Sequence, residues 1–138
     1  LLIAKAYFDK KITIFGGKQW RSFVHLEDAA QAYLKCLESP IEKTKGKVFN
    51  LASEDYRIID IGRIIKSAFP GIKLMVNNKI SDRRNYKVSH QKIAQTLGYA
   101  PKVKVNDAIT EIKRIFKNGI IKNYKDPRYR TPLSHVQR

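Results

Sequence analysis

Cysteine is almost absent from this sequence, because Cys36 is the only one in 138 residues. A single thiol excludes an internal disulfide and a metal site built from several cysteines. No apolar run approaches the roughly 18 residues that a membrane-spanning helix needs, and residues 1–4 are too few to form a signal peptide. We therefore expect a cytoplasmic protein that does not enter a membrane, in which Cys36 is a packing residue.

The signatures of several enzyme classes are also missing. The histidines His25, His90 and His135 lie far apart, and none belongs to an H-E-x-x-H motif, so no metal site is predicted. The sequence has neither a G-x-S-x-G nucleophile motif nor a phosphate-binding loop of the Walker type. Hydrolase and nucleoside triphosphatase activities therefore lack their main support.

Acidic residues are scarce. Twelve Asp and Glu stand against 28 Lys and Arg, which gives a formal net charge of +16 and an isoelectric point near 10.1. Such an excess raises nucleic acid as a partner. The lysines are scattered along the chain, however, and predict a solvated basic surface. A basic α/β module that binds nucleic acid non-specifically stays an alternative, and it predicts a steep salt dependence.

The length and the first residues bear on domain organisation. With 43% hydrophobic residues, 138 residues can enclose one core but not two. The chain has no initiating Met, and it opens on an apolar helical segment without a capping residue in front of it. We expect one domain from a longer protein.

The first forty residues predict two helices and two short strands. A helix is expected over residues 1–9, a β-branched strand over 12–15 closed by Gly16-Gly17, and an extended segment over 22–25. A further helix begins at Leu26 and ends before Pro40, because apolar residues recur at helical spacing. They are Leu26, Ala29, Ala30, Tyr33, Leu34 and Leu37.

The rest of the chain alternates strand and helix patterns. Residues 48–52 show little polar alternation, as expected for a strand buried on both faces of a parallel sheet. A helix over 61–68 and a strand over 73–76 continue a βαβ-like rhythm. Ser89 can cap a helix that ends at Gly98, and a last helix over 108–116 stops before Gly119.

A run of residue types at fixed spacing follows the first glycine turn. Arg21, Phe23, His25 and Asp28 come in order, with two alanines directly after the aspartate. This segment resembles the R-x-F-x-H-V-x-D-A-A segment of extended short-chain dehydrogenases/reductases. Residues 48–53 and 82–101 are similar to the Y/F-N-x-G-S strand and to the later segments of the same family. The resemblance is to the NAD-dependent epimerase/dehydratase family and covers residues 1 to about 119.

The resemblance implies a fold and a function. The fold class is α/β, the C-terminal portion of an extended Rossmann-type fold, with the last sheet strand and helix plus a small α/β substrate-binding lobe. Residues 1–121 would be the substrate-binding part of a nucleotide-sugar epimerase or dehydratase. Residues 122–138 would be a basic tail, poorly ordered or loosely docked, since they show no periodicity.

Cofactor and partners follow from the same resemblance. Relatives bind NAD or NADP on an N-terminal Rossmann half that carries a catalytic Tyr-x-x-x-Lys pair. That half and a nucleotide diphosphate sugar would be the partners, and a homodimer of the parent protein is allowed. We expect no catalytic, cofactor-binding or metal-binding residue in this chain and no activity from it alone. A degenerate scaffold without catalysis is a further alternative.

Three basic residues are the predicted substrate contacts. By resemblance, Arg21 faces the diphosphate of the nucleotide sugar, and a guanidinium suits that role because its rigid fork of donors matches phosphate oxygens. A second contact is expected from Arg83 or, next in order, Lys79, although the relatives often have an arginine where this sequence has Lys79. Arg84 and Lys87 could equally be solvated charges.

Other family-like residues are predicted to be architectural. His25 stands where a strand turns into a helix, Asp28 lies in the first turn of that helix, and Asn50 follows the strand at 48–52. Tyr7 and Lys11 formally match Tyr-x-x-x-Lys, but Lys11 abuts a strand and the pair is discounted. Likewise, Gly16-Gly17 lacks the other glycines of a dinucleotide-binding loop.

Overall fold

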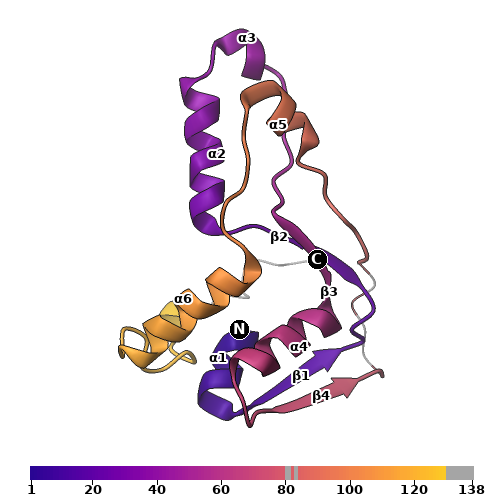
Figure 1. Ribbon diagram of the computed structural model, residues 1–138, viewed down its shortest axis with the longest axis vertical. Coiled ribbons are helices and arrows are strands. Elements are labelled where there is room, and N and C mark those ends of the chain that lie inside the picture. The colour runs from indigo at the N-terminus through magenta and orange to yellow at the C-terminus, as the bar shows by residue number, and fades with distance from the viewer. Residues whose placement is uncertain (80–81, 83, 130–138) are drawn as a thin grey trace.

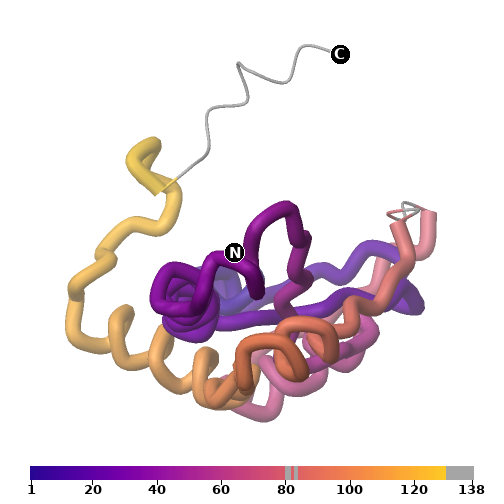
Figure 2. Tube along the Cα trace, turned by 90° about the horizontal axis from the view of Figure 1, so that it is seen from above, coloured from indigo at the N-terminus to yellow at the C-terminus, as the bar shows by residue number. Residues whose placement is uncertain are grey.

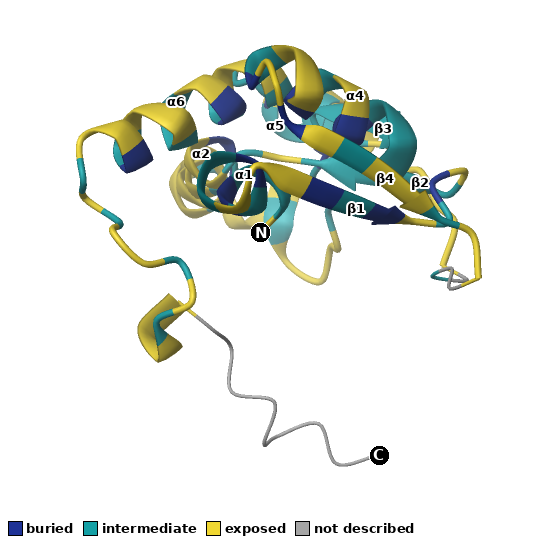
Figure 3. Ribbon diagram, turned by 90° about the horizontal axis from the view of Figure 1, so that it is seen from below, coloured by how far each residue is buried: buried dark blue, intermediate teal, exposed yellow. Residues whose placement is uncertain are grey.

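Two strands far apart in the sequence form a parallel pair at one end of the molecule (Figure 1). The computed structural model describes residues 1–79, 82 and 84–129. In it, β1 (Lys11–Phe15) pairs with β4 (Lys73–Asn77). Alternate residues Ile12 and Ile14 of β1 are buried, and they appear as the dark bands of that strand in Figure 3. Both predicted strands are confirmed.

Helix α4 (Ile58–Ala68) lies directly on this pair. Ile61 and Ile65, one turn apart, are buried against it. Gly62 faces the sheet, and a Cβ added there would meet Ile14 Cγ1 at 3.0 Å. The helix can therefore approach β1 this closely only because position 62 has no side chain. The predicted helix over 61–68 is confirmed and begins three residues earlier.

The N-terminal segment and α6 close the same core. The chain runs through α1 (Leu2–Ala4) and a π-helical turn, η1 (Lys5–Asp9), before a left-handed Lys10 turns it into β1. The amphipathic α6 (Val105–Lys117) packs against α1 and α4. The buried residues of this core are Ala6, Ile12, Ile61, Ile65, Phe69, Ile72 and Ile109. Both helices were expected from the sequence.

An antiparallel pair, β2 (Trp20–Phe23) with β3 (Glu54–Arg57), lies at the middle of the molecule. The strand expected over 48–52 is wrong, and β3 instead begins at Glu54. A strand needs a neighbour for its backbone groups, and the described residues provide a ladder partner only after Ser53, whose amide donates to the Phe23 carbonyl at 2.7 Å. The polar residues of β3 gave no strand pattern in the sequence.

Three helices occupy the opposite end (Figure 1), which faces the viewer in the view from above (Figure 2). They are α2 (Leu26–Glu38), the short α3 (Ile41–Thr44) and α5 (Gln91–Leu97). A small core of Ala32, Ile93 and Tyr99 lies between α2 and α5, with Cys36 packed against it as expected. Burial raises the pKa of the Tyr99 phenol, and the Asp28 carboxylate adds to the rise.

The basic C-terminal segment is docked where the structure describes it. After α6, Tyr124 stacks on Phe8 with a ring-centroid distance of 5.6 Å, and its hydroxyl donates to the Asp9 carboxylate. The 3-10 turn η2 (Pro127–Tyr129) follows. The remainder of the tail expected over 122–138 lies outside the described residues. Within the described ranges, no helix is long and apolar enough to cross a membrane.

Candidate anion-binding site

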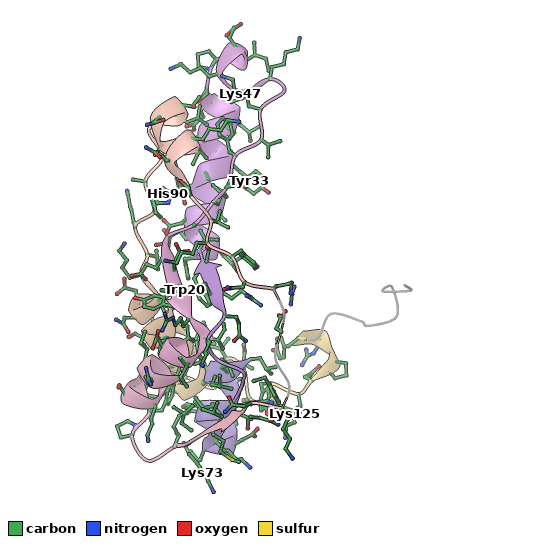
Figure 4. All side chains as sticks on the ribbon, turned by 90° about the vertical axis from the view of Figure 1, so that its right-hand side faces the viewer. Trp20, Tyr33, Lys47, Lys73, His90 and Lys125 are labelled. Carbon is green, nitrogen blue, oxygen red and sulfur yellow. The ribbon has the colours of Figure 1, made fainter. Side chains whose placement is uncertain are left out.

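The site is built on β2, midway along the molecule, where Figure 4 labels Trp20. Arg21 stands opposite Tyr56 of β3 on one side. On the other side, the segment around Asn85 runs beside β2, because the Trp20 amide donates to Asn85 Oδ1 at 2.8 Å and the Val88 amide donates to Ser22 Oγ at 2.7 Å. β2 therefore brings Arg21 against a segment more than sixty residues away in sequence.

The Arg21 guanidinium is held in place by four neighbours. Its Nη1 donates to the carbonyl oxygen of Trp20 at 2.6 Å and to that of Arg84. Its Nη2 lies 2.8 Å from Asp82 Oδ2, and its Cζ lies 5.0 Å from the centroid of the Tyr86 ring. The side chain is only 12% exposed. Such a guanidinium is pre-oriented and loses little side-chain entropy when it binds an anion.

Part of the donor capacity of Arg21 is left for a ligand. Arginine carries five N–H donors. Contacts within the described part of the chain use both donors of Nη1 and one of Nη2. The Nε–H and one Nη2–H stay without a partner among those residues. Two donors on a fixed, permanently charged group suit phosphate oxygens.

Asp82 is the only acidic partner of Arg21 in the described residues. Its pKa lies well below the usual range of an aspartate, chiefly because the Arg84 side chain donates hydrogen bonds to it, with further donation from the Arg84 amide and from Arg21. A lowered pKa means that this carboxylate stabilises the fold at neutral pH and loses that effect only as the pH falls toward the lowered value. The cluster therefore keeps its charges at any working pH.

The other predicted contacts do not join Arg21 in the described structure. Lys79 is exposed just after β4, where its amide donates to Asn77 Oδ1 at 3.0 Å, and no described contact links it to Arg21. Arg83 lies outside the described residues. The structure instead brings together Asp82, Arg84 and Tyr86. The sequence analysis left Arg84 as a residue that could equally be a solvated charge. The only sequence signal for its pairing with Asp82 was its position two residues after that aspartate, inside a basic run.

The residues predicted to be architectural have structural roles. His25 caps α2, because its Nδ1 accepts from the Glu27 amide at 3.3 Å, and its Nε2 lies 3.2 Å from Glu111 Oε2 on α6. Asp28 is buried, and its two oxygens accept the amides of Lys102 and Val103 at 2.9 Å each. Asp28 therefore does more than favour the start of α2 through the helix dipole, because it also holds α2 to the segment before α6. Asn50 is exposed in irregular chain, without the strand expected before it.

The residues of the two discounted motifs contribute to packing and to strand β1. Tyr7 lies in η1 and its ring packs against Phe8, Phe69 and Phe116, whereas Lys11 is the first residue of β1. The pair does not share a helix. At Gly17, where φ is 102°, a Cβ would meet Ile59 Cβ at 3.1 Å. Gly17 therefore serves the packing of α4.

This chain resembles proteins of known structure and one family model. A model of the NAD dependent epimerase/dehydratase family matches residues 1–52. UDP-glucuronic acid 4-epimerase from Bacillus cereus, solved with UDP-glucuronic acid and NAD, is 26% identical with a TM-score of 0.70, over 85% of this chain and 38% of that one. ADP-L-glycero-D-manno-heptose-6-epimerase from Helicobacter pylori is 23% identical with a TM-score of 0.69, over 83% and 35%.

A third similar structure is an enzyme whose name refers to an amino acid instead of a nucleotide sugar. L-threonine dehydrogenase from Phytophthora infestans has a TM-score of 0.73 at 10% identity, over 86% of this chain and 40% of that one. The chain thus spans well under half of the proteins it matches. Its fold is a portion of that of the extended short-chain dehydrogenases/reductases, which confirms the α/β class. The match of residues 1–52 to the model of the NAD dependent epimerase/dehydratase family confirms the resemblance.

Proposed function

We propose that this chain is the substrate-binding part of an NAD(P)-dependent nucleotide-sugar epimerase or dehydratase, and that it binds the diphosphate of a nucleotide sugar through Arg21. The observation that carries the proposal is the state of that guanidinium. It is fixed by Trp20, Asp82, Arg84 and Tyr86, and yet within the described residues it keeps two donors without a partner. It also stands in the segment that matches the family model.

The cofactor is proposed to bind elsewhere. Family membership implies NAD, but the described residues offer no glycine-rich loop between a strand and a helix, and Gly17 is occupied by packing. Within the described helices, no tyrosine is followed by a lysine at the Tyr-x-x-x-Lys spacing. The proposal therefore assigns NAD and the catalytic acid/base pair to a Rossmann half outside this chain.

The exposed face of α2 supports such a second half. The apolar residues on that face, unlike Ala32 on the other face, do not enter a core. Leu26 is 84% exposed and Leu37 is 82% exposed, and Figure 4 shows Tyr33 pointing outward from the helix. Leu26 also borders an apolar cavity of about 580 Å³ between β2, α4 and α6, which Leu1 lines as well. We propose that the Rossmann half covers this face, because the matched enzymes have more than half of their chain to supply it.

Without that half, the chain alone should have marginal stability and associate with itself through α2. Leu37→Asp should weaken self-association about tenfold, because burying a leucine stabilises by roughly 1.5–3 kcal/mol. Gln31→Asp adds the same charge at another exposed position of α2 and should change little. Size-exclusion chromatography over a concentration series measures the effect. A sharply melting monomer at all concentrations would contradict the proposed covering of α2.

The substrate class can be tested on the chain itself. Trp20 is the only tryptophan and its carbonyl accepts from Arg21, so its fluorescence reports on the site. We expect a saturable response to at least one of UDP-glucose, GDP-mannose and dTDP-glucose, and none to L-threonine at the same ionic strength. A response to L-threonine, or to none of these compounds, would contradict a nucleotide-sugar site.

A further inference from the structure

Lysines from separate segments gather around one cluster of aromatic rings at the end of the molecule that holds β1 and β4. Neighbouring rings of the cluster have centroids between 4.9 and 6.4 Å apart, and they belong to Tyr7, Phe8, Phe69, Phe116 and Tyr124. Three ammonium groups lie 5.0 to 5.5 Å from ring centroids of this cluster, those of Lys10, Lys113 and Lys125. The fold therefore concentrates charges that are far apart in the sequence.

Two further lysines stand next to this cluster on the parallel strands. Lys11 of β1 and Lys73 of β4 are direct partners in the register, and both are exposed. The Lys73 amide also donates to the Lys10 carbonyl oxygen at 2.9 Å, which brings the third lysine beside them. Like charges opposite each other on a sheet destabilise it. An anionic group bound over these lysines would relieve that repulsion.

The positive charge at this end is almost uncompensated. Among the described residues, Asp9 is the only acidic side chain in an ion pair with these five lysines, through Lys125 Nζ at 3.8 Å from Asp9 Oδ1. Figure 4 shows Lys73 and Lys125 at the same end of the molecule, with Trp20 of the candidate site midway and Lys47 at the opposite end. The basic end is therefore separate from the Arg21 site.

An exposed apolar side chain accompanies these lysines. Ile120 follows α6 directly and is 68% exposed, although its amide is fixed by a hydrogen bond to the Ile115 carbonyl oxygen at 3.1 Å. Lysines with an adjacent exposed apolar residue suit an anionic bilayer, where the ammonium groups meet headgroups and the apolar side chain enters the interface. Nucleic acid fits less well, because the rings pack on one another instead of offering free faces to bases.

We propose that this basic end is a surface that docks on an anionic lipid bilayer without crossing it. The surface is defined by Lys10, Lys11, Lys73, Lys113, Lys125 and Ile120. The lysines provide an attraction that acts within a Debye length of the bilayer, and Ile120 adds apolar contact. The inference goes beyond the proposed function, since it concerns where the protein is held and does not involve Arg21.

The test is sedimentation of the 138-residue chain with vesicles of equal parts phosphatidylcholine and phosphatidylglycerol. The chain should bind these vesicles, less tightly as salt is added, and should not bind vesicles of phosphatidylcholine alone. The double variant Lys73→Gln and Lys125→Gln should weaken binding roughly twentyfold, because each lysine near an anionic bilayer contributes about fivefold in affinity. Ile120→Asn should weaken vesicle binding about fivefold and leave binding to duplex DNA unchanged.

The opposite end of the chain provides a matched control. Lys45→Gln with Lys47→Gln removes the same charge from two exposed positions there, and it should weaken vesicle binding less than about threefold. Circular dichroism checks that each variant keeps the fold. Equal weakening by the two double variants would mean that only net charge matters, and the docking surface would be wrong. Tighter binding to duplex DNA than to vesicles, lost with Lys73 and Lys125, would make nucleic acid the partner and overturn the proposal.

Discussion

Asp28→Ala should destabilise the fold by about 3 kcal/mol, because hydrogen bonds to a charged group contribute about 1.5–3 kcal/mol each. Asp28 is 3% exposed, and its two oxygens accept the amides of Lys102 and Val103. Alanine would leave two part-buried amides without acceptors and would release the segment between α5 and α6 from α2. A loss of that size is a large share of the stability of an ordinary domain.

Urea denaturation followed by circular dichroism measures this loss. Asp28→Asn should cost less than alanine, since an amide keeps one acceptor oxygen for the two amides. Asp107→Ala is the matched control, because Asp107 is exposed and accepts only the Lys104 amide at the start of α6, at 3.0 Å. The loss of such a cap should cost about 1 kcal/mol. Equal effects at positions 28 and 107 would show that Asp28 acts only as a helix-end carboxylate.

Arg21→Ala should weaken nucleotide-sugar binding roughly ten- to a hundredfold, the equivalent of about 1.5–3 kcal/mol for a hydrogen bond to a charged group. Arg21→Lys should recover only part of the loss, because a point charge restores attraction without the bidentate geometry. In a protein that joins this chain to the proposed Rossmann half, NAD binding should stay almost unchanged. Calorimetry with the nucleotide sugar and with NAD gives both constants.

Arg21 also has structural contacts, so the variant needs a stability control. It holds the segment of Asp82 and Arg84 against β2. Arg63→Ala removes another ion-paired arginine, which bonds Asp60 at 2.9 Å on the exposed side of α4, and it should leave nucleotide-sugar binding within about twofold. If Arg21→Ala impaired both ligands equally, or lowered the midpoint of unfolding strongly, its effect would be structural and the phosphate role would be wrong.

The helices other than α3 and η2 could be predicted because their local signals agree with their packing. In α4 and α6, apolar residues recur at helical spacing on the face that reaches the core, and Gly98 takes the left-handed conformation expected at the end of α5. β1 and β4 have β-branched residues whose pattern needs no knowledge of the partner strand. The resemblance to the family depended mainly on residues 21–30, and the match to residues 1–52 includes that segment.

Strand β3 (Glu54–Arg57) could not be predicted, because the pairing of a strand depends on which segment lies beside it. Residues 48–52 have the composition of a buried strand, but the described neighbours provide the ladder only for Glu54–Arg57. The face of α2 shows a related limit. Its helical spacing was correct, but periodicity shows only that apolar residues share a face and cannot tell what covers that face.

The sequence by itself determined the α/β class and the resemblance that the match to residues 1–52 confirms, and it predicted Arg21 as a phosphate contact. Only the tertiary structure decided which residues stand around it. Arg21 meets Asp82 and Arg84 across more than sixty residues because the segment of Asn85 runs along β2. Spacing along the sequence determines which residues share one helix or strand. Contacts between distant segments depend on how the chain folds back on itself, and the charge-assisted hydrogen bonds around Arg21 form only in such contacts.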